Sequence, residues 1–289
     1  MRINEERLVK ISVQGRILSP GEDQDYMTGA DGAPFVMPSC GGICYNVKVG
    51  DCCMGLLGDH IEPGVSVGCA GEGEGARKSF STISCIGNEA VVASGAAKGR
   101  TGLVTGKHDL DRVIVHFDGE TLNLLTHDDA ILIRGYGQGL SLPDFPGVKV
   151  MNADPALILG MGLGAREGRL TVRVAKKIPP CLLGSGMGGA SAYRGDVDIM
   201  TRDEETVREL GLDTLRFGDI VLLEDCDCSY GRDFRRGAAT VGVVSHSDSK
   251  TAGHGPGVTA ILTGRGAIEG ILSEGANIAF YHPIIKGGI

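Results

Sequence analysis

Three of the seven histidines in this 289-residue chain, His60, His246 and His254, lie in turn-rich segments next to apolar runs. Loops at strand ends can bring side chains together in a cleft without removing backbone hydrogen bonds from a sheet. Neutral imidazole is a common metal ligand and an effective general base near neutral pH. These three histidines therefore form a candidate site for divalent-metal or acid–base chemistry.

The segment around His254 is Gly253-His254-Gly255-Pro256-Gly257. Proline restricts the backbone here, and the glycines let a ligand approach closely. The pattern predicts a rigidly displayed imidazole. A tight hairpin turn in which His254 caps a carbonyl is the alternative.

The segment around His60 adds carboxylates to an imidazole. Asp59 precedes His60, and an extended backbone would put His60 and Glu62 on one face. A carboxylate beside an imidazole fits two ligands of one ion, or a base with its orienting partner. The predicted catalytic residues are therefore Asp59, His60, Glu62 and His254, with ordinary loop polarity as the alternative.

His246 and Asp248 follow the apolar run 240–244, two positions apart. That spacing can point both side chains to one side at the end of a strand, which would make half of a metal site. The predicted metal ligands are His60, His246, Asp248 and His254. We expect His60 and His254 to face one cleft with His246 or a nearby acid; a solvated loop at 245–249 is the alternative.

A second glycine cluster covers residues 184–191 and contains Ser185 and Ser191. Successive backbone N–H groups in such a segment can bind an anion, but the Lys-Ser/Thr ending of a nucleotide-binding P-loop is missing. The cluster predicts a substrate-binding segment for a carboxylate or an oxyanion, with Ser185, Gly186 and Ser191 as its residues. A mobile lid or a packed turn is the alternative.

The nine cysteines do not suggest a catalytic or zinc-binding set. Their number is odd, and Cys52 and Cys53 are adjacent, which favours reduced thiols in a cytoplasmic protein over disulfides. The Cys226-X-Cys228 spacing is shorter than the usual gap between zinc ligands.

The elements that must position these loops are predicted to be mostly strands. Residues 7–13 and 169–174 alternate between apolar and polar side chains, as in strands with one wet face. Four continuous apolar runs are expected to be strands buried on both faces: 130–133, 220–223, 240–244 and 258–262. The 47 glycines, against roughly 20 at ordinary usage, indicate many tight turns.

Only two helices are predicted. Asp154-Pro155 is a good cap and first turn for a helix to residue 159. Thr201 to Glu204 has capping-box spacing, and Gly211 would end that helix. The predicted fold class is β-rich α+β, with short strands in barrel- or sandwich-like sheets.

Two pairs of segments resemble each other along the chain. Residues 124–138 and 215–232 both place an acid before a short apolar strand and Tyr-Gly after it. Residues 58–66 and 252–259 both place histidine before Pro-Gly-Val-Ser/Thr. We expect two related β units, 1–147 and 148–289; one compact domain and chance resemblance are the alternatives.

Charge and hydropathy restrict the partners. The formal net charge of -8 does not suit binding to a nucleic-acid backbone, which needs clustered Lys and Arg. No apolar run approaches the length of a membrane span. We expect a cytoplasmic homo-oligomer that binds a small molecule and neither nucleic acid nor membrane.

Several motifs in order along the chain resemble one family. They are GGICYNVKVGD, GDHIEPGVS, SCIGNEA, VTGKH, YGQGL, LRFGDIVLLEDCD, and HSD followed by AGHGPGVT. Together they resemble the prokaryotic family called domain of unknown function 4438. The resemblance implies one shared fold over most of the chain and names no reaction. Cys40, Cys52, Cys53, Cys226 and Cys228 lie outside the shared pattern.

The combined evidence favours a metal-assisted hydrolase acting on a small polar metabolite. The strand-and-Gly-Asp pattern is similar to that of the acetamidase and formamidase class of amidohydrolases, which favours an amide bond. A lyase-like or isomerising enzyme remains open, as does a non-catalytic small-molecule-binding or oligomeric scaffold protein. The metal content of the purified protein would distinguish enzyme from scaffold.

Overall fold

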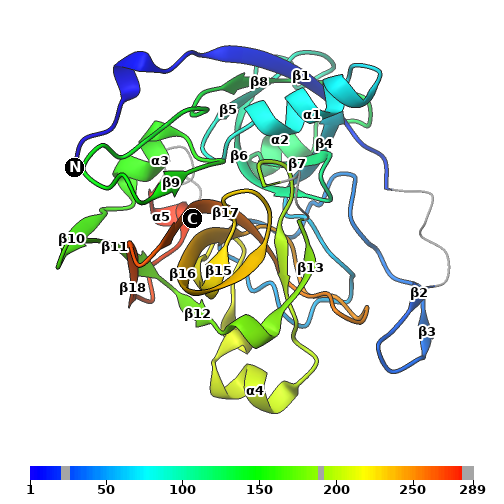
Figure 1. The fold of residues 1–289 in the computed structure, drawn as a ribbon. Coiled ribbons are helices and arrows are strands. Elements are labelled where there is room, and N and C mark those ends of the chain that lie inside the picture. The colour runs from blue at the N-terminus through cyan, green and yellow to red at the C-terminus, as the bar shows by residue number, and fades with distance from the viewer. Residues whose placement is uncertain (21–26, 188–191, 282–289) are drawn as a thin grey trace.

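The computed structural model describes residues 1–20, 27–187 and 192–281, and it is built mainly from strands (Figure 1). The predicted β-rich fold with short helices is confirmed. The helices are α1 (Glu74–Ile83), α2 (Gly119–Leu122), α3 (Pro155–Gly160), α4 (Glu204–Glu209) and α5 (Ile278–Tyr281), with 3-10 turns at Glu5–Arg7, Pro180–Leu182 and Leu212–Thr214. Within the described residues, no helix is long and apolar enough to cross a membrane.

The first half of the chain forms a closed six-stranded barrel. In barrel order its strands are β1 (Ile11–Ile17), β4 (Val65–Cys69), β7 (Arg112–His116), β6 (Thr101–His108), β5 (Glu89–Val92) and β8 (Ala130–Gly135). Valine and isoleucine side chains fill the interior. A Cβ at Gly15 would lie 2.6 Å from the ring of Phe80, so glycine in β1 makes room for α1 to pack on the barrel.

The second half forms a seven-stranded sheet. Its order is β12 (Lys176–Ile178), β15 (Ile220–Asp227), β16 (Asp233–Val244), β17 (Gly257–Arg265), β14 (Val197–Ile199) and β13 (Leu183–Gly186), and β9 (Lys149–Val150) pairs with β17. A smaller sheet contains β10 (Gly164–Arg166), β11 (Arg169–Val174) and β18 (Ile268–Leu272). A separate hairpin pairs β2 (Met27–Thr28) with β3 (Pro34–Phe35).

Barrel and sheet meet where β6 passes β17. The Thr259 hydroxyl accepts a hydrogen bond from the backbone N–H of Lys107 at 3.0 Å and donates one to its carbonyl at 3.1 Å. A Cβ at Gly106 would lie 2.5 Å from the Cβ of Ser245, so glycine allows the close approach. This contact brings the end of β6 next to the loops that flank β16 and β17.

Several local predictions needed correction. The first strand begins at Ile11 rather than residue 7, and Val9 and Ile11 are exposed. The run 130–133 alternates between buried and half-buried residues, whereas 220–223, 240–244 and 258–262 are buried throughout. The helix after residue 201 is capped by Asp203, which accepts from the Thr206 N–H, rather than by Thr201.

Candidate metal centre

His60 lies in a turn that is tied to a distant loop. Its Nδ1 donates to Asp59 Oδ2 at 2.7 Å, while Asp59 Oδ1 accepts from the Ser249 hydroxyl and the Lys250 N–H at 2.9 and 2.8 Å. Asp59 is fully buried, and His60 has a left-handed backbone with φ of 52°. Because the Asp59 carboxylate holds the Nδ1 proton, the Nε2 atom of a neutral His60 carries a lone pair.

His108 is held in the same way at the end of β6. Its Nδ1 lies 2.6 Å from Glu62 Oε1, and Glu62 Oε2 accepts from the Gly41 N–H and the Ser66 hydroxyl. Burial alone would raise the pKa of Glu62, but the hydrogen bond and charge of His108 lower it to about 2. An ionised Glu62 therefore fixes His108 with Nε2 directed away from the carboxylate.

His246 follows β16 and is completely buried. Its Nδ1 donates to the Ser247 carbonyl at 3.0 Å, and its Nε2 lies 2.7 Å from Asp196 Oδ2. Neither Nε2 of His246 nor Oδ2 of Asp196 has a hydrogen-bond partner of normal geometry among the described residues. Burial opposes a charged imidazole, but Asp196 and Asp198 raise the pKa of His246 well above its usual value. The pair therefore attracts a positive charge, either a proton or a metal ion.

Asp196 and Asp198 come from one strand segment, with Val197 between them. Side chains two positions apart in a strand share a face, and both aspartates are almost completely buried. Burial raises the pKa of Asp198, but the imidazoles of His246, His254 and His60 beside it outweigh burial, so the net shift is strongly downward. Both carboxylates therefore face the histidines.

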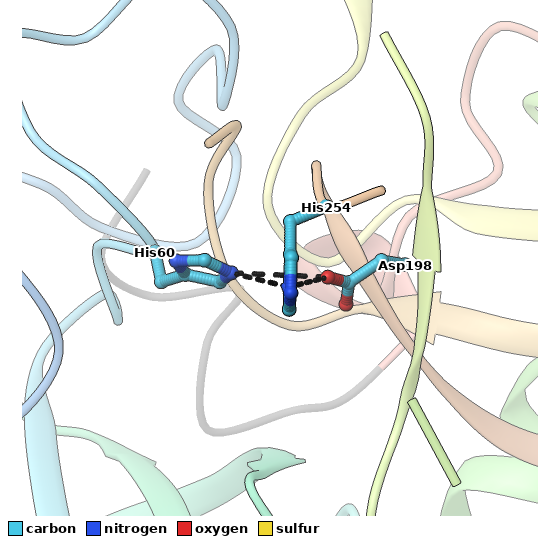
Figure 2. Close-up of side chains that lie close together, drawn as sticks. All are labelled: His60, Asp198 and His254. Atoms are coloured by element: carbon cyan, nitrogen blue, oxygen red, sulfur yellow. Dashed lines mark hydrogen bonds and ion pairs between the residues drawn. The ribbon is translucent and has the colours of Figure 1, made fainter. Parts of the chain in front are cut away.

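His254 completes the cluster from the turn before β17. Its Nδ1 lies 2.8 Å from Asp198 Oδ2 and 3.2 Å from His60 Nε2. Figure 2 shows the three side chains facing one another. The side chain of His254 is 33% exposed, and that of His60 is 12% exposed. Solvent therefore reaches the cluster from the side of His254.

Glycines flank His254 because the backbone passes very close to its neighbours. A Cβ at Gly255 would lie 1.8 Å from the Ile199 carbonyl oxygen. A Cβ at Gly257 would lie 2.1 Å from both Asp196 Oδ2 and His246 Nε2. The glycine-rich sequence therefore lets β17 run directly beside the cluster.

Two sets of three side chains have the geometry of a metal site. His60, Asp198 and His254 form one, and His108, Asp196 and His246 form the other, and within each set the candidate ligand atoms lie within 4.8 Å of one another. Imidazole and carboxylate ligands together suit first-row divalent metals.

The structure brings some of the sequence-predicted site residues together and leaves others apart. His60, His246 and His254 meet, with Asp59 and Glu62 behind the imidazoles. Asp248 belongs to neither ligand set: its Oδ1 accepts from the Thr201 hydroxyl and the Ser249 N–H.

Ser185 and Gly186 of the predicted substrate-binding segment lie beside the turn that carries His254. The Ser185 N–H donates to the Gly253 carbonyl at 2.7 Å, and Gly186 pairs with Val197 in the sheet. Ser191 lies outside the described residues. Ser185 therefore contacts the histidine turn through its backbone.

The sequence interpretation missed His108, Asp196 and Asp198. His108 ends a strand rather than lying in a glycine-rich turn. The usable signal for the aspartates was the Asp-X-Asp spacing at the start of β14, which puts both on one face.

Other cavities lie away from the cluster. One of about 750 Å³ is lined by Lys48, Lys176 and Arg216 among others, and one of about 570 Å³ is lined by His116 and Phe117 among others.

All nine cysteines lie in the described residues and are free of disulfides.

Comparison with known proteins confirms the family resemblance. Residues 26–159 match the N-terminal part, and residues 158–282 the C-terminal part, of a family described as a domain of unknown function, DUF4438. The fold is similar to that in the crystal structure of TM1086, with 46% sequence identity, a TM-score of 0.93, and coverage of 98% of this chain and 99% of that chain. No curated protein matches this chain.

Proposed function

We propose that this chain, which belongs to the DUF4438 family, is a metal-dependent hydrolase that cleaves a small polar molecule, with an amide as the favoured bond. The observation that carries the proposal is the convergence of His60 Nε2, His254 Nδ1 and Asp198 Oδ2 at the solvent-reached edge of the cluster. A divalent ion held there would polarise a carbonyl oxygen and activate water. In amide cleavage the water oxygen bonds to the carbonyl carbon, the C–N bond breaks, and the amine leaves with the proton from water.

The roles proposed for the residues differ from those expected from the sequence alone. His60 and His254 would be ligands. Asp59 and Glu62 are positioning residues, because their oxygens already accept hydrogen bonds from His60 and His108 and from nearby backbone and hydroxyl groups. Ser185 lies on the strand beside His254, where its hydroxyl would contact a substrate.

Elemental analysis of protein purified without a metal-affinity tag tests the proposal first. We expect bound first-row divalent metal. The metal-free protein, reloaded with Zn²⁺, should release ammonia from members of a panel of small primary amides. His254→Ala should lose this activity, whereas His127→Ala, an exposed histidine outside the cluster, should keep it.

The proposal would be contradicted if the purified protein contained no metal and if added Zn²⁺ produced no hydrolysis. It would favour the alternative of a non-catalytic ligand-binding or scaffold protein.

A further inference from the structure

The two ligand sets are close enough to form a single centre. The ring centroids of His60 and His246 lie 5.0 Å apart, and those of His108 and His246 lie 4.1 Å apart. His60 and His108 are stacked at 5.5 Å with an interplanar angle of 12°. Four imidazoles and two aspartates therefore gather around one small volume, six candidate ligands where a single tetrahedral ion takes four.

Asp198 extends between the two sets. Its Oδ2 lies 2.8 Å from His254 Nδ1 and 3.7 Å from His60 Nε2 in the outer set. Its Oδ1 lies 3.5 Å from His246 Nε2 in the inner set. One carboxylate therefore offers one oxygen to each set, as a bridging ligand does.

Three imidazoles are oriented so that lone pairs point inward. Asp59, Glu62 and the Ser247 carbonyl accept from the Nδ1 atoms of His60, His108 and His246. These acceptors carry no proton of their own to donate at neutral pH, so each neutral imidazole is protonated at Nδ1 and presents Nε2 as a ligand atom.

The inner set contains a buried pair of polar atoms that favours a positive charge. Asp196 Oδ2 and His246 Nε2 are fully buried and 2.7 Å apart, and among the described residues neither has a hydrogen-bond partner. A buried imidazole nitrogen and carboxylate oxygen this close together are costly unless a positive charge, either a proton or a metal ion, lies with them. A metal ion bound by both atoms and by His108 would satisfy them.

We propose that the cluster binds two divalent ions bridged by Asp198. The inner ion is held by His108, Asp196 and His246, and the outer ion by His60 and His254. The pair would be spaced as in two-metal hydrolases, where the ions lie about 3.5–4 Å apart. This inference rests on the proposed function for its catalytic meaning, but its test needs no substrate. The outer ion faces solvent and would exchange faster than the inner one.

Calorimetric titration of the chelator-treated full chain with Zn²⁺ tests the two-ion centre, with bound metal counted by elemental analysis. We expect two equivalents per chain. His108→Ala should bind one equivalent by loss of the inner ion, and His254→Ala should bind one by loss of the outer ion. Asp198→Asn should weaken both sites by at least about 10-fold, because it removes the shared charge.

His116→Ala is the matched control. His116 is a half-buried histidine in β7, paired with β6 but outside both ligand sets. The His116→Ala protein should still bind two equivalents of Zn²⁺ per chain.

Anomalous scattering at the zinc edge from crystals of the wild-type protein counts the bound ions directly. This measurement does not depend on whether the variants fold. Two peaks on either side of Asp198 would support the proposal. One peak and one equivalent would overturn it, even if the protein hydrolyses amides. Two ions without hydrolysis would support the centre and contradict the proposed function, and no bound ion would contradict both.

Discussion

Asp59 and Glu62 determine which nitrogen of His60 and His108 can bind a metal. Each carboxylate is buried and hydrogen-bonded on both oxygens, so neither is free to take a proton from water. Asp59 and Glu62 therefore influence metal binding only through the imidazoles of His60 and His108. A carboxylate behind a ligand histidine fixes its tautomer and increases its basicity.

Glu62→Gln should therefore weaken metal binding without removing a ligand. Glutamine keeps the shape and an acceptor for His108 Nδ1 but loses the charge, and we expect Zn²⁺ affinity to fall by about 10- to 100-fold. Competition with a chromogenic chelator measures it. Glu89→Gln, which removes a partly exposed carboxylate paired with Arg134, is the control and should leave affinity unchanged. Equal affinity in both variants would show that Glu62 does not act through His108.

Some individual residues of the cluster could be predicted from the sequence. His60, His246 and His254 were recognisable because turns, glycine and proline surround them. His108 was not, since a strand-end histidine between Lys107 and Asp109 has no such local pattern. That it meets Glu62, 46 positions earlier in the chain, depends on the pairing of β4, β7 and β6 rather than on local sequence.

Among the elements, β17 is the one most constrained by the cluster. It begins at Gly257, where a side chain would occupy the space beside Asp196 and His246. We expect Gly257→Ala to push β17 away from the inner ligands, destabilising the metal-free fold by about 1–3 kcal/mol and lowering the Zn²⁺ stoichiometry. Urea unfolding and elemental analysis measure the two effects.

Gly275→Ala supplies the comparison for that substitution. Gly275 is exposed, and a Cβ there would meet nothing within 4 Å. A Gly257→Ala protein as stable and as metal-rich as Gly275→Ala would show that the space beside the cluster is not needed.

The cap of α3 gives a pH-dependent prediction. Asp154 accepts from the Ala156 N–H at 2.6 Å, and burial raises the pKa of its carboxyl to about 6. Because the folded pKa lies above the unfolded value of about 3.9, the fold favours protonated Asp154. That contribution is present below about pH 4 and is lost as the pH rises through 6.

Asp154→Asn keeps a cap acceptor and does not ionise. Metal-free wild type should therefore lose stability relative to Asp154→Asn between pH 4.5 and 7.5, by on the order of 2 kcal/mol. Urea unfolding at both pH values measures the difference. A difference that stays constant with pH would mean that Asp154 titrates normally.

Strands were easier to predict than helices for a physical reason. In β15, β16 and β17 the runs 220–223, 240–244 and 258–262 are buried at every position. Each run is therefore recognisable in the sequence as a continuous stretch of mainly apolar residues. Helix α1 begins after Gly73 with no side-chain cap, so no capping residue marks its start in the sequence. Barrel closure joins β1 to both β4 and β8, and such distant pairings leave no local signal.

Across the whole molecule, the candidate centre spans the junction of barrel and sheet. His60 and His108 come from the barrel half, and the aspartates, His246 and His254 come from the sheet half. The predicted division near residue 147 stays a prediction; the barrel strands end at Gly135, and the strands of the second sheet begin at Lys149. Neither half holds a complete ligand set.

Thr259→Val should therefore impair metal binding from a position outside the cluster. Valine keeps the shape of threonine but leaves the buried N–H and carbonyl of Lys107 without the Thr259 hydroxyl. We expect a loss of about 2 kcal/mol or more in unfolding free energy, together with weaker Zn²⁺ binding. Thr101→Val, exposed at the start of β6, should change neither. Full Zn²⁺ affinity in Thr259→Val would show that the junction does not control the centre.

The order of the ligands along the chain sets a time at which an ion can enter. Ribosomal synthesis releases the barrel half, with His60 and His108, before the part of the chain that carries the aspartates. Asp196 and Asp198 emerge later, and His254 later still. We therefore expect insertion of the proposed ions to be a late step in the protein's maturation, and a chain truncated before residue 254 would lack one ligand of the proposed outer ion.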